Sequence, residues 1–328
     1  MLRKIAYINA GGTIASMGRD AFDLLDYNAT GERIDAASLV ERSGANGIVA
    51  DIVPVEFRRL DSTAISNRDW VDLVELCRTL AADASIDGMV VGQGTASLEE
   101  TAWLLALVLR IDKPVVVTGS MRPVNGISSD SGANLAGAVR VAAGAAARGA
   151  GVLVVLNDEI HAPRAVAKTH TLRLNAFQSP WSGPIGFVDG PMVRLAVPAA
   201  LPELARFRPE LVRGLPRVDI VYSHIGADGT AIRAFVAAGA RGLVSAGFGP
   251  GVGTPAEIAA LGEAVAAGIP VVQSSRVGAG HVVDSAHHRD VGILAGSDLN
   301  PQKARILLAL CLARGDHHAG IAEVFAAL

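Results

Sequence analysis

The 328-residue chain has few aromatic residues, few cysteines and no cluster of basic residues, and each shortage excludes a class of protein. Aromatic residues make up 4% and charged residues 19%, whereas 50% are hydrophobic, so small and aliphatic side chains must build the core. This composition is typical of a glycine-rich α/β enzyme and not of an all-β or disordered protein. A formal net charge of -3 without a basic tract argues against a nucleic-acid surface.

The sequence also lacks the features of a secreted or membrane protein. Its two cysteines, Cys77 and Cys311, lie far apart in helix-like segments, which favours buried thiols in a reducing compartment over a disulfide. No apolar run approaches the length of a membrane span. The first residues read as a core strand and not as a secretory signal. We therefore expect a cytoplasmic protein that binds neither membrane nor nucleic acid.

Short apolar runs bounded by glycine or polar residues recur along the chain, and they predict strands buried on both faces. These runs are Ile5–Asn9, Met89–Val91, Val115–Thr118, Val152–Leu156, Val218–Tyr222, Leu243–Ala246 and Val271–Gln273. Helix-like stretches lie between many of them: Leu98–Arg110, Asn134–Arg148, Ala256–Ala267 and Gln302–Leu312. This alternation predicts βαβ units and a parallel sheet.

A stretch with several prolines divides the chain. Residues 191–216 contain few strand signals and no glycine before Gly214, so they read as a connection. We predict an α/β fold with a larger N-terminal parallel-sheet domain over residues 1–195, a linker over 196–216 and a smaller α/β C-terminal domain over 217–328.

Glycine-rich loops that carry hydroxyl groups follow the predicted strands. The sequence AGGTIA at residues 10–15 follows the first strand, and GQGTAS at residues 92–97 follows the next strong one. Because the carboxyl ends of parallel strands meet at one edge of a sheet, these loops should converge there. Tight turns explain the glycines, but not the adjacent Thr13 and Thr95. Ser97 fits a different role, because Ser97 with Glu100 forms a capping-box pattern.

The sequence gives little or no support for a nucleotide site, a metal site or a serine-hydrolase site. Neither Gly11–Thr13 nor Gly247–Gly253 has the spacing of a dinucleotide fingerprint or the lysine of a P-loop. The pairs His287–His288 and His317–His318 are adjacent residues that point in different directions, and no H-E-x-x-H motif is present. The G-x-S-x-G elbow of serine hydrolases is also absent. We therefore expect no cofactor and no metal.

In combination, these loops resemble the signatures of the bacterial-type L-asparaginase/glutaminase family, and the resemblance covers nearly the whole chain. Ala10–Ala15 is similar to the first signature (TGGTIA), and Gly92–Ala102 is similar to the second (THGTDTMEETA). Three further blocks follow as in the family: Asp112–Pro123, Val166–Thr169 and Leu299–Arg305. The resemblance implies an amidohydrolase that uses a threonine nucleophile to release ammonia from asparagine or a related small carboxylate-bearing amide.

The resemblance also implies roles for individual residues. Thr13 matches the nucleophile, Tyr27 the tyrosine that activates or orients it, Thr95 the second catalytic threonine and Lys168 its partner lysine. The residues expected around the substrate are Ser62, Thr63, Gly94, Ala96 and His287, of which Ser62 matches the serine that holds the substrate carboxylate. This chemistry is reasonable, because a threonine hydroxyl needs a neighbouring base. A lysine can be that base if burial or a nearby cation lowers its pKa.

Three positions depart from the family pattern, and each departure removes a group that would bind the substrate α-ammonium. Ala96 stands where the family has an aspartate that completes the threonine–lysine set and binds the substrate α-ammonium. His287 replaces a glutamate lent by the neighbouring subunit, and Val252 replaces an asparagine. Because an unpaired ammonium in a closed site is costly, we hypothesise that the substrate lacks a free α-ammonium or carries it blocked. The alternative is that nearby acids such as Asp130 or Asp284 replace the missing groups.

Two other interpretations remain. A non-catalytic ligand-binding relative is disfavoured because Thr13, Tyr27, Thr95 and Lys168 are all retained. The asparaginase-like subunit of an archaeal tRNA amidotransferase is disfavoured because that subunit carries an N-terminal extension, whereas the first signature here starts at residue 10. The family generally forms tetramers built from tight dimers, so the resemblance implies a homo-oligomer, a dimer of dimers, that binds a small-molecule amide.

Overall fold

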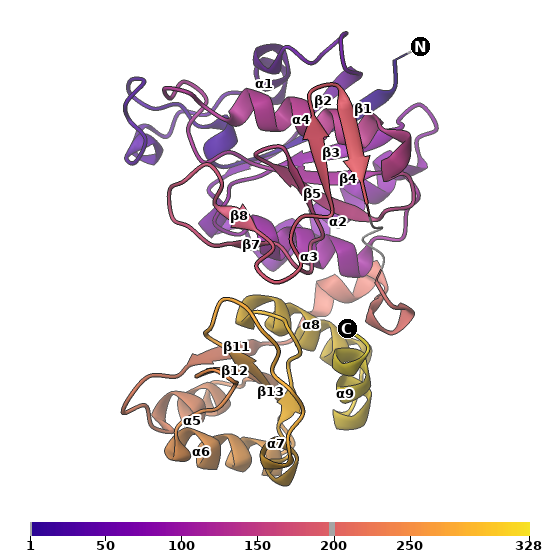
Figure 1. Cartoon of the computed structure of the whole chain (residues 1–328). Coiled ribbons are helices and arrows are strands. Elements are labelled where there is room, and N and C mark those ends of the chain that lie inside the picture. Colours follow the sequence, from indigo (N-terminus) through magenta and orange to yellow (C-terminus); the bar gives the residue numbers. More distant parts are fainter. Residues whose placement is uncertain (1, 197–200) are drawn as a thin grey trace. The chain divides into compact units, whose positions relative to one another are not determined.

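The computed structural model describes residues 2–196 and 201–328, and the chain divides into two compact units, Met1–Ala200 and Leu201–Leu328 (Figure 1). Of the linker predicted at residues 196–216, residues 197–200 lie outside the described residues. Much of its remainder forms two 3-10 helices, Glu203–Ala205 and Pro209–Gly214, within the second unit. The domain boundaries that we inferred from the sequence stay a prediction.

The first unit is built on an eight-stranded sheet in the order β10-β9-β6-β5-β4-β3-β1-β2. Its strands are β1 (Lys4–Gly11), β2 (Asp51–Leu60), β3 (Gly88–Gly92), β4 (Val115–Thr118), β5 (Val152–Leu156), β6 (Glu159–His161), β9 (Gly186–Asp189) and β10 (Met192–Leu195). Strands β1 to β5 run parallel, and β6, β9 and β10 extend the sheet in antiparallel fashion. Two short strands, β7 (Ala167–Lys168) and β8 (Phe177–Gln178), form a separate antiparallel pair.

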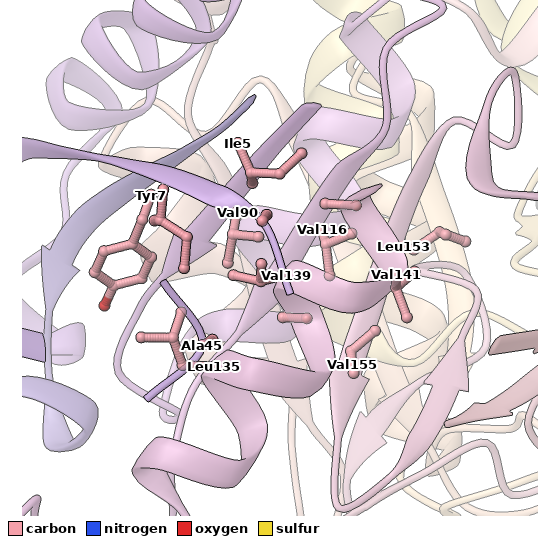
Figure 2. Packing of buried hydrophobic residues seen from close by; sticks show 14 of the residues in the cluster. Ile5, Tyr7, Ala45, Val90, Val116, Leu135, Val139, Val141, Leu153 and Val155 are labelled. Carbon is pink, nitrogen blue, oxygen red and sulfur yellow. The ribbon is translucent and has the colours of Figure 1, made fainter. Parts of the chain in front are cut away.

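Helices cover both faces of this sheet, which explains why its central strands are apolar on both sides (Figure 1). The helices are α1 (Ala36–Ser43), α2 (Asn67–Ala82), α3 (Leu98–Val108) and α4 (Ser131–Ala143). Helices α1 and α4 lie on one face, and α2 and α3 lie on the other. Ile5 and Tyr7 are two residues apart in β1, so they point to the same face and pack with Val90 and with Leu135 and Val139 of α4 (Figure 2).

The second unit contains a smaller, fully parallel sheet in the order β11-β12-β13-β14. Its elements are β11 (Val218–Tyr222), α5 (Thr230–Ala237), β12 (Gly242–Gly247), α6 (Pro255–Ala266), β13 (Val271–Ser275), α7 (Ala286–Val291), β14 (Leu294–Ala295), α8 (Pro301–Arg314) and α9 (His318–Ala326). Val221, Leu243 and Val271 pack against Ile232 of α5 and Leu261 of α6 in its core. The predicted fold class, a larger parallel-sheet domain followed by a smaller α/β domain, is confirmed.

The element boundaries differ from the sequence prediction in places. The helix predicted over Asn134–Arg148 begins three residues earlier and ends at Ala143, because Gly144 adopts an extended conformation that stops the helix. Across the described residues, we find no helix with both the length and the apolarity needed to cross a bilayer.

Candidate active site

The two glycine-rich loops that follow β1 and β3 touch each other. The strands are paired in parallel with Asn9 opposite Gly92, so both loops leave the sheet at the same edge. A Cβ atom on Gly12 would lie 2.0 Å from the Cα atom of Gly94, and Gly12 has a φ of 80°, which glycine adopts without strain. The convergence that strand order predicts is therefore present, and it depends on glycine at both positions.

Thr13 stands at the start of a short 3-10 helix, Thr13–Ala15, directly after this contact. Its side chain is almost fully buried, with 8% of the residue exposed. The Oγ1 atom of Thr13 lies 2.8 Å from the phenolic oxygen of Tyr27, and either hydroxyl can donate. The hydroxyl of Ser131, at the start of α4, donates to the carbonyl of Ile14 at 3.0 Å. The Thr13 hydroxyl is thus held beside a second hydroxyl by a loop tied to α4.

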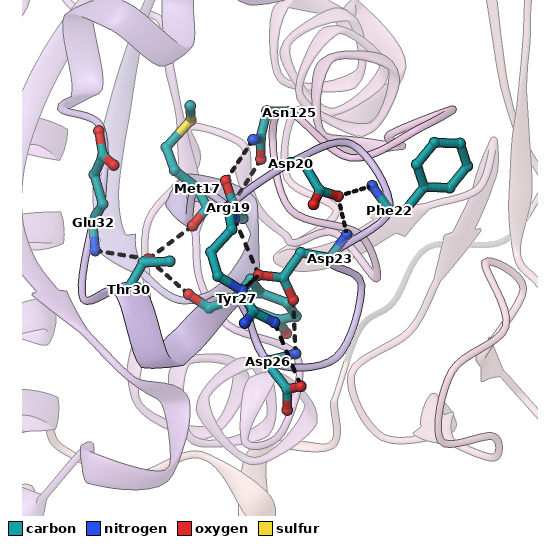
Figure 3. Close-up of polar contacts among 11 residues, drawn as sticks. Met17, Arg19, Asp20, Phe22, Asp23, Asp26, Tyr27, Thr30, Glu32 and Asn125 are labelled. Atoms are coloured by element: carbon teal, nitrogen blue, oxygen red, sulfur yellow. Dashed lines mark hydrogen bonds and ion pairs between the residues drawn. The ribbon is translucent and has the colours of Figure 1, made fainter.

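The loop that carries Tyr27 is shaped by its own polar contacts (Figure 3). The side-chain amide of Asn125 accepts from the N–H of Gly18 at 2.8 Å and donates to the carbonyl of the same residue at 2.7 Å. The guanidinium of Arg19 donates to the carboxylate of Asp23 at 2.8 Å. These bonds order the segment between Thr13 and Tyr27, so the short contact between the two hydroxyls has structural support.

Thr95, on the neighbouring loop, forms a second pair with Lys168. The ammonium of Lys168, in β7, donates to the Oγ1 atom of Thr95 at 2.8 Å, and only 5% of Thr95 is exposed. Burial lowers the pKa of Lys168, and the negative charge of Glu99 acts in the opposite direction but does not cancel the effect. A lowered lysine pKa increases the fraction of neutral amine, the form that can accept a proton.

Ser62 contacts the loop that carries Thr95. Its hydroxyl accepts a hydrogen bond from the N–H of Ala96 at 3.2 Å, and a Cβ atom on Gly94 would lie 2.8 Å from that oxygen. The hydroxyl of Ser97 donates to the carbonyl of Ser62 at 2.7 Å. The predicted capping box of Ser97 with Glu100 is therefore wrong: Ser97 is the N-cap residue of α3, but its hydroxyl bonds Ser62 and makes no cap.

The last two predicted residues are exposed, Thr63 in the first unit and His287 in the second. Thr63 is exposed in the 3-10 turn Ser62–Ala64. His287 is exposed in α7 of the second unit. The first unit gathers the other predicted residues, because contacts link Thr13 to Tyr27, Lys168 to Thr95, and Ser62 to Gly94 and Ala96. The roles assigned to all of them stay predictions.

The acids considered as replacements for the missing carboxylate already have partners. Asp130 accepts hydrogen bonds from the N–H groups of Met121 and Arg122 at 2.8 and 2.9 Å, and burial raises the pKa of its carboxyl. In the second unit, the guanidinium of Arg289 donates to Asp284 at 2.7 Å. Both carboxylates therefore serve their local structure, which disfavours them as ammonium ligands.

Sequence reasoning assigned no role to Glu99, although it lies within the second signature. Only 5% of Glu99 is exposed, and its carboxylate accepts a hydrogen bond from the main-chain N–H of Lys168 at 2.8 Å. The available signal was a carboxylate in the first turn of a helix that directly follows the Thr95 loop. An ion pair between Arg33 and Asp61, the residue before Ser62, was also missed.

Among residues 2–196 and 201–328, no cluster of three or more histidine, cysteine, aspartate and glutamate side chains is arranged to hold a metal ion. The candidate site is instead built from hydroxyl groups, one lysine and the backbone of glycine-rich loops. This donor set suits nucleophilic attack and proton transfer.

Comparison with known proteins matches two family descriptions to the chain. Residues 4–200 match "Asparaginase, N-terminal" and residues 217–325 match "Glutaminase/Asparaginase C-terminal domain". The chain is 36% identical to a glutaminase-asparaginase of Pseudomonas fluorescens biotype A, over 95% of this chain and 87% of that protein. It is also 36% identical to L-asparaginase 2 of Bacillus subtilis, over 95% and 83% of the two chains.

A solved structure shows the same similarity in three dimensions. The crystal structure of a probable cytoplasmic L-asparaginase from Campylobacter jejuni superposes with a TM-score of 0.90 at 35% sequence identity. The match covers 99% of each chain, so both units take part in it.

Proposed function

The chain belongs to the asparaginase family and is an amidohydrolase that acts on linear amides, and we propose that it cleaves the side-chain amide of asparagine or of a related small carboxylate-bearing amide. The products are the corresponding acid and ammonia. The observation that carries this proposal is the pair of hydroxyl groups, Thr13 and Thr95, on two touching loops, each with a proton-transfer partner at 2.8 Å.

In the proposed reaction, the Oγ1 atom of Thr13 attacks the amide carbon while its proton passes toward Tyr27. The carbon–nitrogen bond of the resulting tetrahedral adduct breaks, the nitrogen takes up a proton and leaves as ammonia, and an acyl-threonine ester remains. Water then hydrolyses the ester, which returns the proton to Thr13. Lys168 in its neutral form is suited to accept a proton from Thr95 or from water during these steps.

The glycine-rich loops can also stabilise the negative charge of the tetrahedral adduct. Within the described chain, the backbone N–H groups of Gly94 and Thr95 donate to no protein acceptor. Glycine at positions 12 and 94 lets the two backbones approach closely. Fixed backbone donors of this kind stabilise an oxyanion without reorganisation.

We further propose that the preferred substrate lacks a free α-ammonium group. Ala96 supplies no carboxylate beside Thr95, and the Glu99 carboxylate is buried and bonded to Lys168. Asp61 is paired with Arg33. An ammonium enclosed without an anionic partner is disfavoured. A succinamate-like or N-acylated amide would keep the carboxylate for Ser62 and avoid this cost.

A substrate panel tests the function. Ammonia release is measured from asparagine, glutamine, D-asparagine, succinamate and N-acetylasparagine, with Thr13→Ala as the inactive control. We expect the highest kcat/KM for succinamate or N-acetylasparagine. Preference for free asparagine would overturn the substrate class but keep the amidohydrolase, whereas silence across the panel from a folded enzyme would contradict the proposed function.

Introducing a carboxylate at position 96 should redirect the specificity. We expect Ala96→Asp to raise kcat/KM for free asparagine by about 10- to 100-fold relative to N-acetylasparagine, because a charge-assisted hydrogen bond contributes about 1.5–3 kcal/mol. Ala96→Asn is the matched control, since asparagine has the shape of aspartate without its charge. Equal kinetics for the two variants would show that position 96 does not select for the ammonium.

The assembly and location follow from the similarity alone. We propose a homotetramer, a dimer of dimers, and a mass in solution of four times the 33.7 kDa chain would support it. We propose a cytoplasmic location because of the similarity to the Campylobacter jejuni protein named as probably cytoplasmic. Another relative, from Haemophilus influenzae and 35% identical, is named as a probable periplasmic L-asparaginase, so cell fractionation decides between the two compartments.

A further inference from the structure

The loop that presents Thr95 continues directly into α3, and this helix begins with a buried carboxylate. Thr95, Ala96 and Glu99 lie within five consecutive residues, so the loop and the first helical turn share one short segment. Position 96 carries only a methyl group. The carboxylate of this segment that contacts Lys168 is that of Glu99, four residues after Thr95.

Glu99 is buried in a way that demands a partner. A carboxylate with 5% exposure is costly unless hydrogen bonds or charges compensate it. The amino end of α3 supplies part of the compensation, because a helix N-terminus favours negative charge. The main-chain N–H of Lys168, which donates to the Oε2 atom at 2.8 Å, supplies another part. Lys168, whose side chain contacts Thr95, thus offsets part of the free-energy cost of burying Glu99.

Two hydrogen bonds of Lys168 connect Glu99 to Thr95. Its N–H is fixed by Glu99, and its side chain reaches Thr95 Oγ1 at 2.8 Å. Lys168 lies in a strand of only two residues, so β-sheet pairing alone gives little support. We propose that Glu99 is a positioning residue for the Thr95–Lys168 pair. This inference rests on the proposed function, because it assigns Glu99 to the same site.

Electrostatics gives the proposal a second consequence. Glu99 is the charged group whose field raises the pKa of Lys168 against the larger effect of burial. Replacing Glu99 by glutamine keeps an oxygen that can accept the Lys168 N–H but removes the charge. The protonated lysine then loses a favourable interaction, so the pKa of Lys168 falls. The limb of the pH profile that reports loss of the Lys168 proton should move to lower pH.

The kinetic test compares Glu99→Gln and Glu99→Ala with Glu100→Gln, which removes the neighbouring carboxylate of the same helical turn. On the best substrate of the panel, Glu99→Gln should shift the pH profile of kcat/KM to lower pH. Glu99→Ala should lower kcat by roughly 10²-fold with little change in KM, because the base is misplaced. Unshifted profiles with kcat within twofold of the wild-type value would overturn the proposal.

A measurement without turnover separates this inference from the proposed function. The chain has four lysines, Lys4, Lys113, Lys168 and Lys303, so ¹³C-lysine labelling gives a small set of signals that Lys168→Arg can assign. The Lys168 midpoint should move to lower pH in Glu99→Gln and stay unchanged in Glu100→Gln. A moved midpoint in an enzyme silent on the panel would keep this inference and reject the function. An unmoved midpoint in an active enzyme would do the reverse.

If Glu99→Gln does not fold, Glu99→Asp tests the positioning role of Glu99, because aspartate keeps the charge on a shorter side chain. The Lys168 midpoint should then remain near the wild-type value while kcat falls. A wild-type kcat in Glu99→Asp would overturn the positioning role.

Discussion

Ammonia release should fall by roughly 10⁴-fold or more when Thr13 is replaced by alanine, because the substitution removes the nucleophile of the proposed reaction. Thr13 is nearly buried, and its Oγ1 atom lies 2.8 Å from the Tyr27 oxygen. The variant loses one hydroxyl and one methyl group and keeps the backbone contact between the two loops. Substrate binding should therefore persist, and the loss should appear in kcat and not in KM.

Two further variants show whether the hydroxyl itself is responsible. Thr13→Ser retains the oxygen and should keep a substantial part of the rate, whereas Thr13→Val keeps the shape and should be as inactive as Thr13→Ala. Steady-state ammonia assays give the rates, and thermal unfolding shows that the variants are folded. Turnover by Thr13→Val within tenfold of the wild-type rate would assign the nucleophile to another residue.

The central strands of the fold could be predicted because they are short, apolar and buried on both faces. The run Val152–Leu156 coincides with β5, and Val115–Thr118 coincides with β4. The edge strand β2 was missed because most of its residues are exposed or only partly buried, and Pro54 interrupts the pattern. An edge strand has one free side, so its sequence lacks the continuous apolar run that marks a central strand.

The helix α2 was missed for a related reason. Its surface is charged and only one face is apolar, with Leu73, Val74 and Cys77 buried. A recognisable signal was present, since Ser66 and Asp69 form a capping box at its start. The same type of pattern at Ser97 and Glu100 misled the prediction. A capping pattern indicates a helix start, but tertiary contacts decide which partner the serine hydroxyl takes.

The candidate site was only partly readable from the residues alone. Strand order predicts that the loops bearing Thr13 and Thr95 converge, and the close approach of Gly12 to Gly94 agrees with it. Lys168 is 73 residues from Thr95 in sequence, so no local pattern predicts their contact. That pairing came from the family resemblance. The hydrogen bond between Glu99 and the main chain of Lys168 could be found only in the structure, because every residue except proline has a main-chain N–H and the sequence does not show which acceptor it takes.

Replacing Lys168 by methionine should lower kcat/KM by about 10²- to 10⁴-fold, which is the usual contribution of a general base. Methionine is similar in length to lysine, so the half-buried position stays filled while the hydrogen bond to Thr95 is lost. Lys168→Arg separates two roles for the same nitrogen, since arginine keeps a cation but cannot lose its proton near neutral pH. If Lys168 acts as a base, both variants are equally impaired. If it acts only through its charge, Lys168→Arg retains activity.

The stability of Lys168→Met should move in the opposite direction from its activity, which would exclude unfolding as the cause of its lost activity. Burial lowers the pKa of Lys168 in the folded state, so the unfolded chain binds this proton more tightly. The charged lysine therefore opposes folding below its lowered pKa, and this penalty disappears as pH rises toward the unfolded value. Lys168→Met removes the penalty, so its Tm at neutral pH should equal or exceed that of the wild type, and the difference should shrink as pH rises. A lower Tm at neutral pH would mean that the Lys168–Thr95 bond stabilises the fold by more than burial of the ammonium costs, and the lost activity would then need a structural explanation.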